Sequence, residues 1–250
     1  MPHFQHNGID IAYLDEGSGD PIVLVHGFAS NKEANWVNPN WVKALTGAGM
    51  RTIALDNRGH GQSTKLYDPG DYTLDKMAGD VVALMDHLNI ARADVFGYSM
   101  GARIVGYVAA HFPARVRSAI IAGIGIRLTQ PGMNGEKIAA ALEAPDASTV
   151  KDQLALGFRV FADSTKSDLK ALAACMRTWS RTIAREDAAS IRVPVLVATG
   201  TTDTIAGSGP ELAALIPGAK NLDIANRDHM RTVGDPLFKQ GVLNFLAQRP

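Results

Sequence analysis

Short runs of apolar residues recur along the chain and are separated by stretches with helical periodicity. The first two runs, at 3–5 and 9–14, alternate around Asn7-Gly8, a residue pair typical of a β-hairpin turn. The later runs are continuous and rich in β-branched residues, which is typical of strands buried on both faces of a parallel sheet. They lie at 21–25, 52–55, 93–96, 118–122, 193–198 and, more weakly, 220–224. Helical patterns between them lie at about 41–49, 74–88, 100–111, 210–216 and 235–247. This alternation predicts an α/β fold with a mostly parallel sheet covered by helices on both faces.

One region departs from this alternation. Between residues 127 and 190 no run is typical of a buried strand, and helical patterns dominate. One apolar stripe has the spacing of a helix face and consists of Leu169, Leu172, Cys175, Met176 and Trp179. Neither end of the region carries a long Gly/Ser-rich or Pro-rich linker. We therefore expect residues 127–190 to form an inserted helical cap, and residues 1–126 and 191–250 to form the core.

The strongest chemical motif is Gly97-Tyr98-Ser99-Met100-Gly101. It follows a predicted buried strand and precedes a predicted helix. A tight turn in this context holds a serine in a strained conformation with its hydroxyl projecting from the sheet, and the glycines let strand and helix close on it. The alternative interpretation is a surface turn rich in small residues. The motif and its context together favour a nucleophilic serine at position 99.

A serine hydroxyl needs a base to remove its proton, and that base needs an orienting group. His229 is the best candidate for the base, because it lies in a polar loop between the last predicted strand and the C-terminal helix. His60, in a glycine-rich loop, is the main rival. Asp203 is the preferred acid, because it directly follows a predicted strand, at the end where α/β sheets present functional groups. Asp228 adjoins His229 in the chain and cannot easily reach its ring, and Asp223 lies inside a strand pattern.

The negative oxygen of a tetrahedral intermediate needs hydrogen-bond donors that are already in place. His26-Gly27-Phe28 follows the predicted strand at 21–25, where a backbone N–H can turn toward the serine. We expect the N–H groups of Phe28 and Met100 to supply these donors. The alternative for the first is an ordinary turn at the exit of a strand.

Taken together, these motifs resemble the α/β-hydrolase superfamily, on its serine esterase and lipase-like side, over essentially the whole chain. The matching segments are His26–Phe28, Asp56–Ser63, Gly97–Gly101, Gly200–Asp203 and Asp228–His229. The resemblance implies an α/β-hydrolase fold, with an eight-stranded, mostly parallel sheet flanked by helices and a small helical cap after the sixth strand. It supports Ser99, Asp203 and His229 as the catalytic residues, in the family's chain order, and a structural role for His60.

Composition narrows the classes of partner. The chain has 25 Lys and Arg against 25 Asp and Glu, so no excess charge favours nucleic acid or an anionic membrane. A single cysteine, Cys175, excludes an internal disulfide and a multi-thiolate metal site. The sequence contains no phosphate-binding loop, no complete dinucleotide fingerprint and no zinc-protease spacing of histidines, so we expect no cofactor and no metal. No apolar window is long enough for a membrane span, and no signal segment is visible, which predicts a cytoplasmic location.

These observations predict a carboxylic ester hydrolase that acts through an acyl-enzyme on small-to-medium acyl esters, with oligoesters left open. A serine at position 99 argues against dehalogenases and epoxide hydrolases, which resemble this chain but place a carboxylate there. Alternatives that use the same three residues are a carbon–carbon bond hydrolase and a cofactor-free perhydrolase, and a non-catalytic ligand receptor is a further alternative. The partner is a small-molecule ester, and association of identical chains stays open. We expect the substrate pocket to be lined by Phe28, Tyr98, Met176 and Trp179.

Overall fold

The computed structural model describes residues 2–131, 133–178 and 182–249. Within these ranges the strands form one eight-stranded sheet in the order β1-β2-β4-β3-β5-β6-β7-β8. β1 pairs antiparallel with β2, and β2 with β4, whereas the other neighbouring pairs are parallel. The α/β-hydrolase fold is therefore confirmed, including the opening hairpin. The strands are β1 His3–His6, β2 Ile9–Glu16, β3 Asp20–Val25, β4 Met50–Leu55, β5 Ala93–Tyr98, β6 Val116–Ala122, β7 Val195–Gly200 and β8 Lys220–Ile224.

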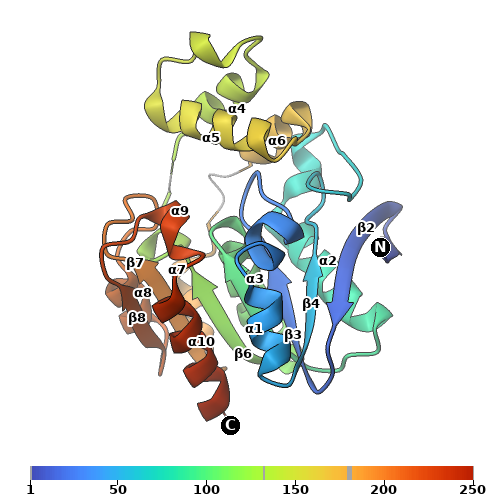
Figure 1. Cartoon of the computed structure of the whole chain (residues 1–250), viewed down its shortest axis with the longest axis vertical. Coiled ribbons are helices and arrows are strands. Elements are labelled where there is room, and N and C mark those ends of the chain that lie inside the picture. The colour runs from blue at the N-terminus through green and yellow to red at the C-terminus, as the bar shows by residue number, and fades with distance from the viewer. Residues whose placement is uncertain (1, 132, 179–181, 250) are drawn as a thin grey trace.

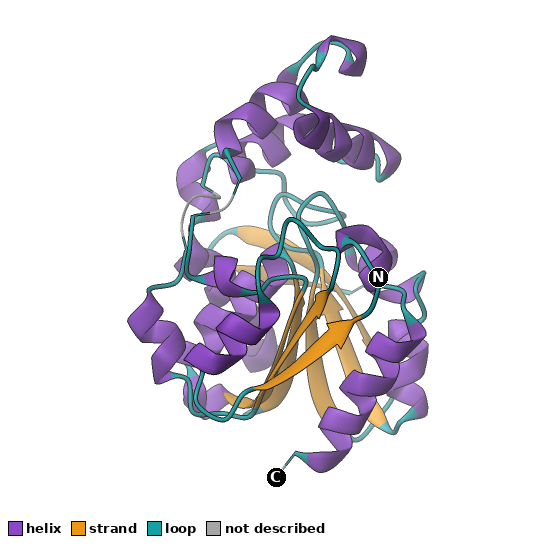
Figure 2. Ribbon diagram, turned by 90° about the vertical axis from the view of Figure 1, so that its left-hand side faces the viewer, coloured by secondary structure: helices purple, strands orange, loops and turns teal. Residues whose placement is uncertain are grey.

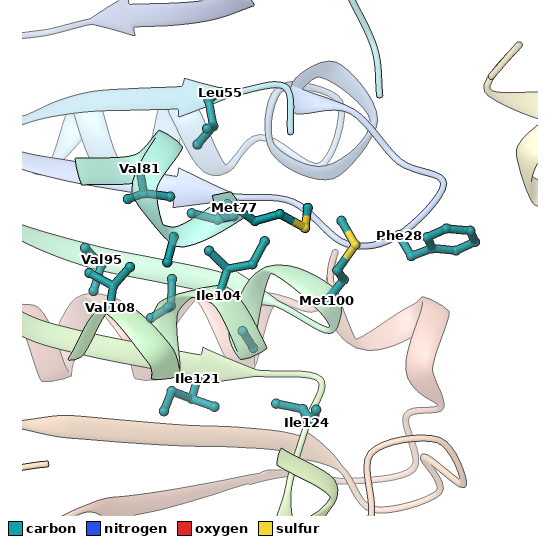
Figure 3. Close-up of a cluster of buried hydrophobic side chains, with 14 of the residues drawn as sticks. Phe28, Leu55, Met77, Val81, Val95, Met100, Ile104, Val108, Ile121 and Ile124 are labelled. Atoms are coloured by element: carbon teal, nitrogen blue, oxygen red, sulfur yellow. The ribbon is translucent and has the colours of Figure 1, made fainter. Parts of the chain in front are cut away.

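Helices cover both faces of the sheet, because the side chains of each strand alternate between the two faces (Figures 1 and 2). On one face the aromatic rings of Trp36, Trp41, Phe96 and Phe238 pack together, with the Trp36 and Phe96 centroids 4.7 Å apart. On the other face, Val95 and Ile121 from the strands pack among aliphatic side chains of α2 and α3 (Figure 3). The core helices are α1 Trp41–Gly47, α2 Leu74–His87, α3 Met100–His111, α7 Arg185–Ser190, α8 Gly209–Leu215, α9 His229–Thr232 and α10 Pro236–Gln248.

The insertion between β6 and β7 forms a separate helical layer above the carboxyl ends of the parallel strands (Figure 1). Its helices are α4 Gly135–Glu143, α5 Gln153–Ser164 and α6 Leu169–Met176, and α4 packs on both of the others. α7 lies against α3 of the core, with Ala188 buried in the core cluster. The helical layer therefore ends before the boundary that we expected at residue 190, and the division into core and cap stays a prediction.

Short helical turns complete the connections. They are η1 Glu33–Val37, a π-helical turn, and four 3₁₀ turns, η2 Pro69–Tyr72, η3 Pro113–Arg115, η4 Ile126–Leu128 and η5 Ala147–Thr149. Among the described residues, no helix has the length and apolar character that crossing a membrane requires.

Candidate active site

Ser99 occupies the tight turn between β5 and α3 with φ 55° and ψ −110°. This conformation is uncommon for a residue with a side chain, and it turns the chain abruptly from strand to helix. The two motif glycines explain how the turn can close. A Cβ on Gly101 would overlap the backbone carbonyl of Val25, and a Cβ on Gly97 would overlap the backbone of Gly101. The glycines on either side of Ser99, which indicated this turn in the sequence, are therefore required because the backbone segments pack closely there.

His229 lies between Ser99 and Asp203, although 130 residues separate it from Ser99 in the chain. Its Nε2 is 3.0 Å from Ser99 Oγ, and its Nδ1 is 2.7 Å from Asp203 Oδ2. The carboxylate of Asp203 is fully buried. Because an ionised carboxylate only accepts hydrogen bonds, Nδ1 carries the proton and Nε2 is left to accept the Ser99 hydroxyl. This arrangement can draw a proton from the serine as it attacks a carbonyl.

Asp203 is itself fixed by the backbone of its own loop. Its Oδ1 accepts hydrogen bonds from the N–H groups of Ile205, at 2.8 Å, and Ala206, at 3.0 Å. One carboxylate oxygen therefore binds the loop backbone, and the other binds the imidazole. This arrangement orients the imidazole without a further side chain.

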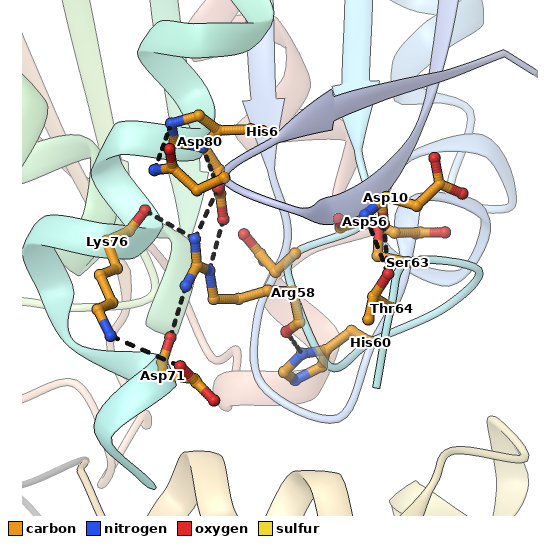
Figure 4. A network of polar contacts seen from close by, with 12 residues as sticks. His6, Asp10, Asp56, Arg58, His60, Ser63, Thr64, Asp71, Lys76 and Asp80 are labelled. Atoms are coloured by element: carbon orange, nitrogen blue, oxygen red, sulfur yellow. Dashed lines mark hydrogen bonds and ion pairs between the residues drawn. The ribbon is translucent and has the colours of Figure 1, made fainter. Parts of the chain in front are cut away.

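The rival residues have other partners. Asp228 caps the first turn of α9, and its Oδ1 accepts hydrogen bonds from the N–H groups of Met230 and Arg231. Asp223 accepts a hydrogen bond from the side chain of Asn221 on the same strand. His60 is buried, and its Nδ1 donates to the carbonyl of Arg58 (Figure 4). Burial lowers the pKa of His60 to about 3, so this histidine is a neutral packing residue.

The loop after β3, residues 26–32, passes directly beside the serine. A Cβ on Gly27 would lie 3.5 Å from Ser99 Cβ. His26 holds the next peptide unit, because its Nδ1 lies 2.7 Å from the Gly27 carbonyl and its Nε2 accepts the N–H of Asn57 at 3.0 Å. Burial lowers the pKa of His26, which matches a neutral ring with these two roles. A peptide unit is planar, so a fixed Gly27 carbonyl also fixes the direction of the Phe28 N–H.

The second expected donor, the N–H of Met100, belongs to the first residue of α3. The first N–H groups of a helix have no carbonyl partner four residues earlier. Both expected donors therefore belong to segments that border Ser99. Their role in binding an oxyanion stays a prediction.

A buried ion pair links the loop after β3 to the loop after β4. Lys32 Nζ lies 2.7 Å from Asp56 Oδ2, and neither side chain is exposed. Asp56 also accepts the backbone N–H groups of Lys32 and Gln62, each at 2.8 Å. Sequence reasoning treated Asp56 only as part of a packed turn and did not mark Lys32. The pattern that could have indicated this pair is a lysine in the loop after the apolar strand β3, together with an aspartate directly after the neighbouring strand β4.

A second buried network fixes the same turn to α2. Arg58 donates to both carboxylate oxygens of Asp80, at 2.7 and 2.8 Å, and His6 Nδ1 lies 2.7 Å from Asp80 Oδ1 (Figure 4). The Asp56–Ser63 segment is therefore positioned at both of its sides by buried charge. It supports the loop beside Ser99 without contributing a reacting group.

A cavity of about 280 Å³ opens beside Ser99 and His229. Phe28 and Tyr98 line it, as we expected, and the Tyr98 hydroxyl donates to the His229 carbonyl at 2.5 Å. Met176 differs from the expectation, because it is fully buried in the core cluster and lies outside the lining of this cavity. Trp179 lies outside the described residues. The cap contributes α5 instead, through Gln153, Leu154, Gly157, Phe158 and Phe161.

Sequence reasoning missed α5 because an apolar helix stripe has the same pattern whether it faces a core or a cavity. Within the described ranges, no three His, Cys, Asp or Glu side chains come close enough together to hold a metal ion. Cys175 is buried, and burial raises the pKa of its thiol well above the usual range.

Comparison with known proteins identifies the family. The model of the alpha/beta hydrolase fold matches residues 20–231, and the chain belongs to this family. It is 38% identical over 116 residues to non-heme chloroperoxidase CPO-A1 of Kitasatospora aureofaciens, a match that covers 46% of this chain and 40% of that protein. The chain thus matches less than half the length of that relative. It is 27% identical over 199 residues to 3-oxoadipate enol-lactonase 2 of Acinetobacter baylyi, covering 74% of this chain and 73% of that one.

Among solved structures, the enol-lactonase from Burkholderia xenovorans LB400 is similar over the whole chain. The TM-score is 0.86 at 26% sequence identity, covering 99% of this chain and 100% of that chain. The relatives named here are thus hydrolases of lactones and a haloperoxidase.

Proposed function

We propose that this protein hydrolyses carboxylic esters, including cyclic ones, through an acyl-enzyme formed on Ser99. The observation that carries the proposal is the row of hydrogen bonds from Asp203 through His229 to Ser99, at 2.7 and 3.0 Å, beside a cavity. A buried carboxylate, a histidine with a fixed tautomer and a strained serine are the parts that acyl transfer needs.

In the first half of the reaction, His229 Nε2 takes the proton of Ser99 as Oγ attacks the ester carbonyl carbon. The N–H groups of Phe28 and Met100 stabilise the negative oxygen, and the loss of one such donor typically costs about 3 kcal/mol of barrier. His229 then passes the proton to the leaving alkoxide, the carbon–oxygen bond breaks, and the acyl group stays on Ser99. A water molecule, deprotonated by His229, repeats the attack and releases the acid.

The lactonase relatives support ester chemistry, because a lactone is a cyclic ester. The chloroperoxidase relative favours one further candidate, a cofactor-free perhydrolase. In that reaction hydrogen peroxide replaces water in the second attack, and the acyl group leaves as a peracid. A carbon–carbon bond hydrolase would use the same three side chains.

The test is turnover of a series of p-nitrophenyl esters by the native chain and by Ser99→Ala, with the exposed Ser190→Ala on α7 as the matched control. We expect steady turnover by the native chain and the control, and a loss of roughly 10⁴-fold or more in kcat for Ser99→Ala. Release of about one product per chain would instead identify a receptor. Equal activity of Ser99→Ala and native protein would overturn the mechanism. Adding hydrogen peroxide and measuring peracid distinguishes the perhydrolase.

A further inference from the structure

Gly157 lies in the interior of α5, in a place where a glycine has no structural purpose. Glycine weakens a helix interior relative to alanine, because it loses more backbone freedom on folding. Its backbone is helical, so no left-handed conformation requires it. A Cβ built on Gly157 would meet no atom within 4 Å. The helical Gly106 of α3 differs, because its Cβ would lie 3.3 Å from Leu128 and a packing reason exists there.

Gly157 is exposed, and the open space beside it borders the cavity at Ser99. Gly157 lines this cavity together with Leu154 and Phe161, which lie about one helical turn on either side of it. The opposite face of α5 is occupied, since Ala155, Arg159 and Ala162 are buried. The face of α5 above the serine is therefore an apolar wall with a gap in its middle.

The rest of the wall is apolar or neutral. Phe158 packs edge-on against Phe28, with ring centroids 5.8 Å apart, which connects α5 to the loop beside the serine. Apart from His229, the residues described around this cavity include no acidic or basic side chain. A carboxylate that packs against this wall would lose part of its hydration without gaining a charged partner, which is costly.

We infer that Gly157 determines substrate size, and that the gap it leaves receives an uncharged, apolar acyl chain of medium length. The inference rests on the proposed ester hydrolysis at Ser99, because the ester carbonyl must lie at the serine for the chain to reach α5. A larger residue at 157 shortens the space without touching the reacting atoms. Gly157 is thus a specificity-determining residue and not a catalytic one.

The experiment compares native protein with Gly157→Ala and Gly157→Leu on p-nitrophenyl esters from acetate to octanoate. A leucine side chain adds four carbon atoms to the gap, and each buried methylene contributes roughly a fourfold factor in binding. We expect kcat/KM of Gly157→Leu to fall by up to roughly 250-fold on octanoate and to stay within about threefold on acetate. On octanoate, kcat/KM of Gly157→Ala should lie between the values of native protein and Gly157→Leu. Both variants should melt no lower than native protein, because alanine and leucine have a higher helix propensity than glycine.

Gly47→Leu is the matched control. Like Gly157, Gly47 is helical and exposed, and a Cβ built on it would meet no atom within 4 Å. Unlike Gly157, it lies on α1 and outside the lining of the cavity. Its chain-length profile should equal the native one. The p-nitrophenyl hemisuccinate, which carries a charge, should react at least about 100-fold more slowly than the pentanoate of similar length. An unchanged profile in Gly157→Leu, or equal rates for these two esters, would overturn the inference.

Binding to Ser99→Ala separates this inference from the proposed function. The ratio of the affinities for 2-decanone and 2-butanone, measured by calorimetry, should fall when Gly157→Leu is added to that variant. A ratio that does not fall overturns the size role even if Ser99-dependent hydrolysis is observed. If the affinity ratio falls but native protein hydrolyses no ester, the size role is supported and the esterase mechanism is rejected.

Discussion

The exchange of Asp203 for asparagine tests how the imidazole of His229 is oriented. Asp203 Oδ1 accepts two backbone N–H groups, from Ile205 and Ala206, whereas Oδ2 faces His229 Nδ1 at 2.7 Å. In Asp203→Asn the amide oxygen must keep the two backbone hydrogen bonds, because an NH₂ group cannot accept them. The NH₂ group then points at Nδ1. Two donors cannot face each other, so His229 must move its proton to Nε2 and donate to Ser99 instead of accepting from it.

The expected loss follows from this change of tautomer. A histidine in the wrong tautomer cannot remove the serine proton, and in a serine triad this costs about 10⁴-fold in kcat. A factor of that size corresponds to roughly 5.5 kcal/mol of activation free energy. Asp228→Asn is the matched control, because Asp228 caps α9 and asparagine caps a helix about as well as aspartate does. We expect its kcat to change by less than about threefold.

The assay is kcat and KM on one p-nitrophenyl ester near pH 8, with thermal melting to show that each variant is folded. Adding Ser99→Ala to Asp203→Asn should lower the rate only slightly beyond Ser99→Ala alone, because residues that act as a unit are not additive. A loss below about tenfold in Asp203→Asn would refute the tautomer argument. A larger loss in Asp228→Asn would move the acid to that residue.

Two further predictions concern stability. Burial lowers the pKa of His60 from 6.5 to about 3, so below pH 6.5 the unfolded chain binds a proton that the folded chain does not. The free energy of unfolding from urea titrations should therefore fall as the pH drops from 6.5 toward 3, by up to about 1.4 kcal/mol per pH unit from this residue, and His60→Gln should show a shallower slope. An identical slope would contradict a buried neutral His60. Asp56→Asn leaves Lys32 without its buried partner, and the free energy of unfolding in urea should fall by about 3 kcal/mol. This value is at the low end for a broken buried ion pair, because Glu33 lies 3.2 Å from Lys32 Nζ and partly compensates its charge. Arg51→Gln, which breaks a more exposed pair with Asp15, should cost under about 1 kcal/mol, and equal losses would contradict the argument.

The core and the serine turn could be predicted because their requirements are local. Strands buried on both faces need continuous apolar runs, and each predicted run corresponds to a strand of the sheet. The turn at Ser99 needs small residues at fixed offsets, because the backbones of β3, β5 and α3 approach closely there. Both requirements appear directly as residue patterns, so the sequence alone predicts the fold.

The cap could be recognised only as helical. An apolar stripe is needed equally by a helix that packs on a core and by one that faces a cavity, so the sequence could not show whether Met176 and Trp179 line the pocket, as we expected. In the structure Met176 of α6 is fully buried, and α5 lines the cavity. Gly157 could not be recognised from the sequence either, because the meaning of a helical glycine depends on what lies opposite it.

The sequence by itself determined the sheet, the strained serine and a short set of candidate partners, since each depends on residues that are neighbours in the chain. Only the tertiary structure brought Asp203 and Ser99 to hydrogen-bond distance from His229. It also paired Lys32 with Asp56, from loops that follow adjacent strands. The physical reason is the same in each case. A hydrogen bond or an ion pair needs its two groups within about 3 Å of each other, and no residue pattern encodes that distance between segments far apart in sequence.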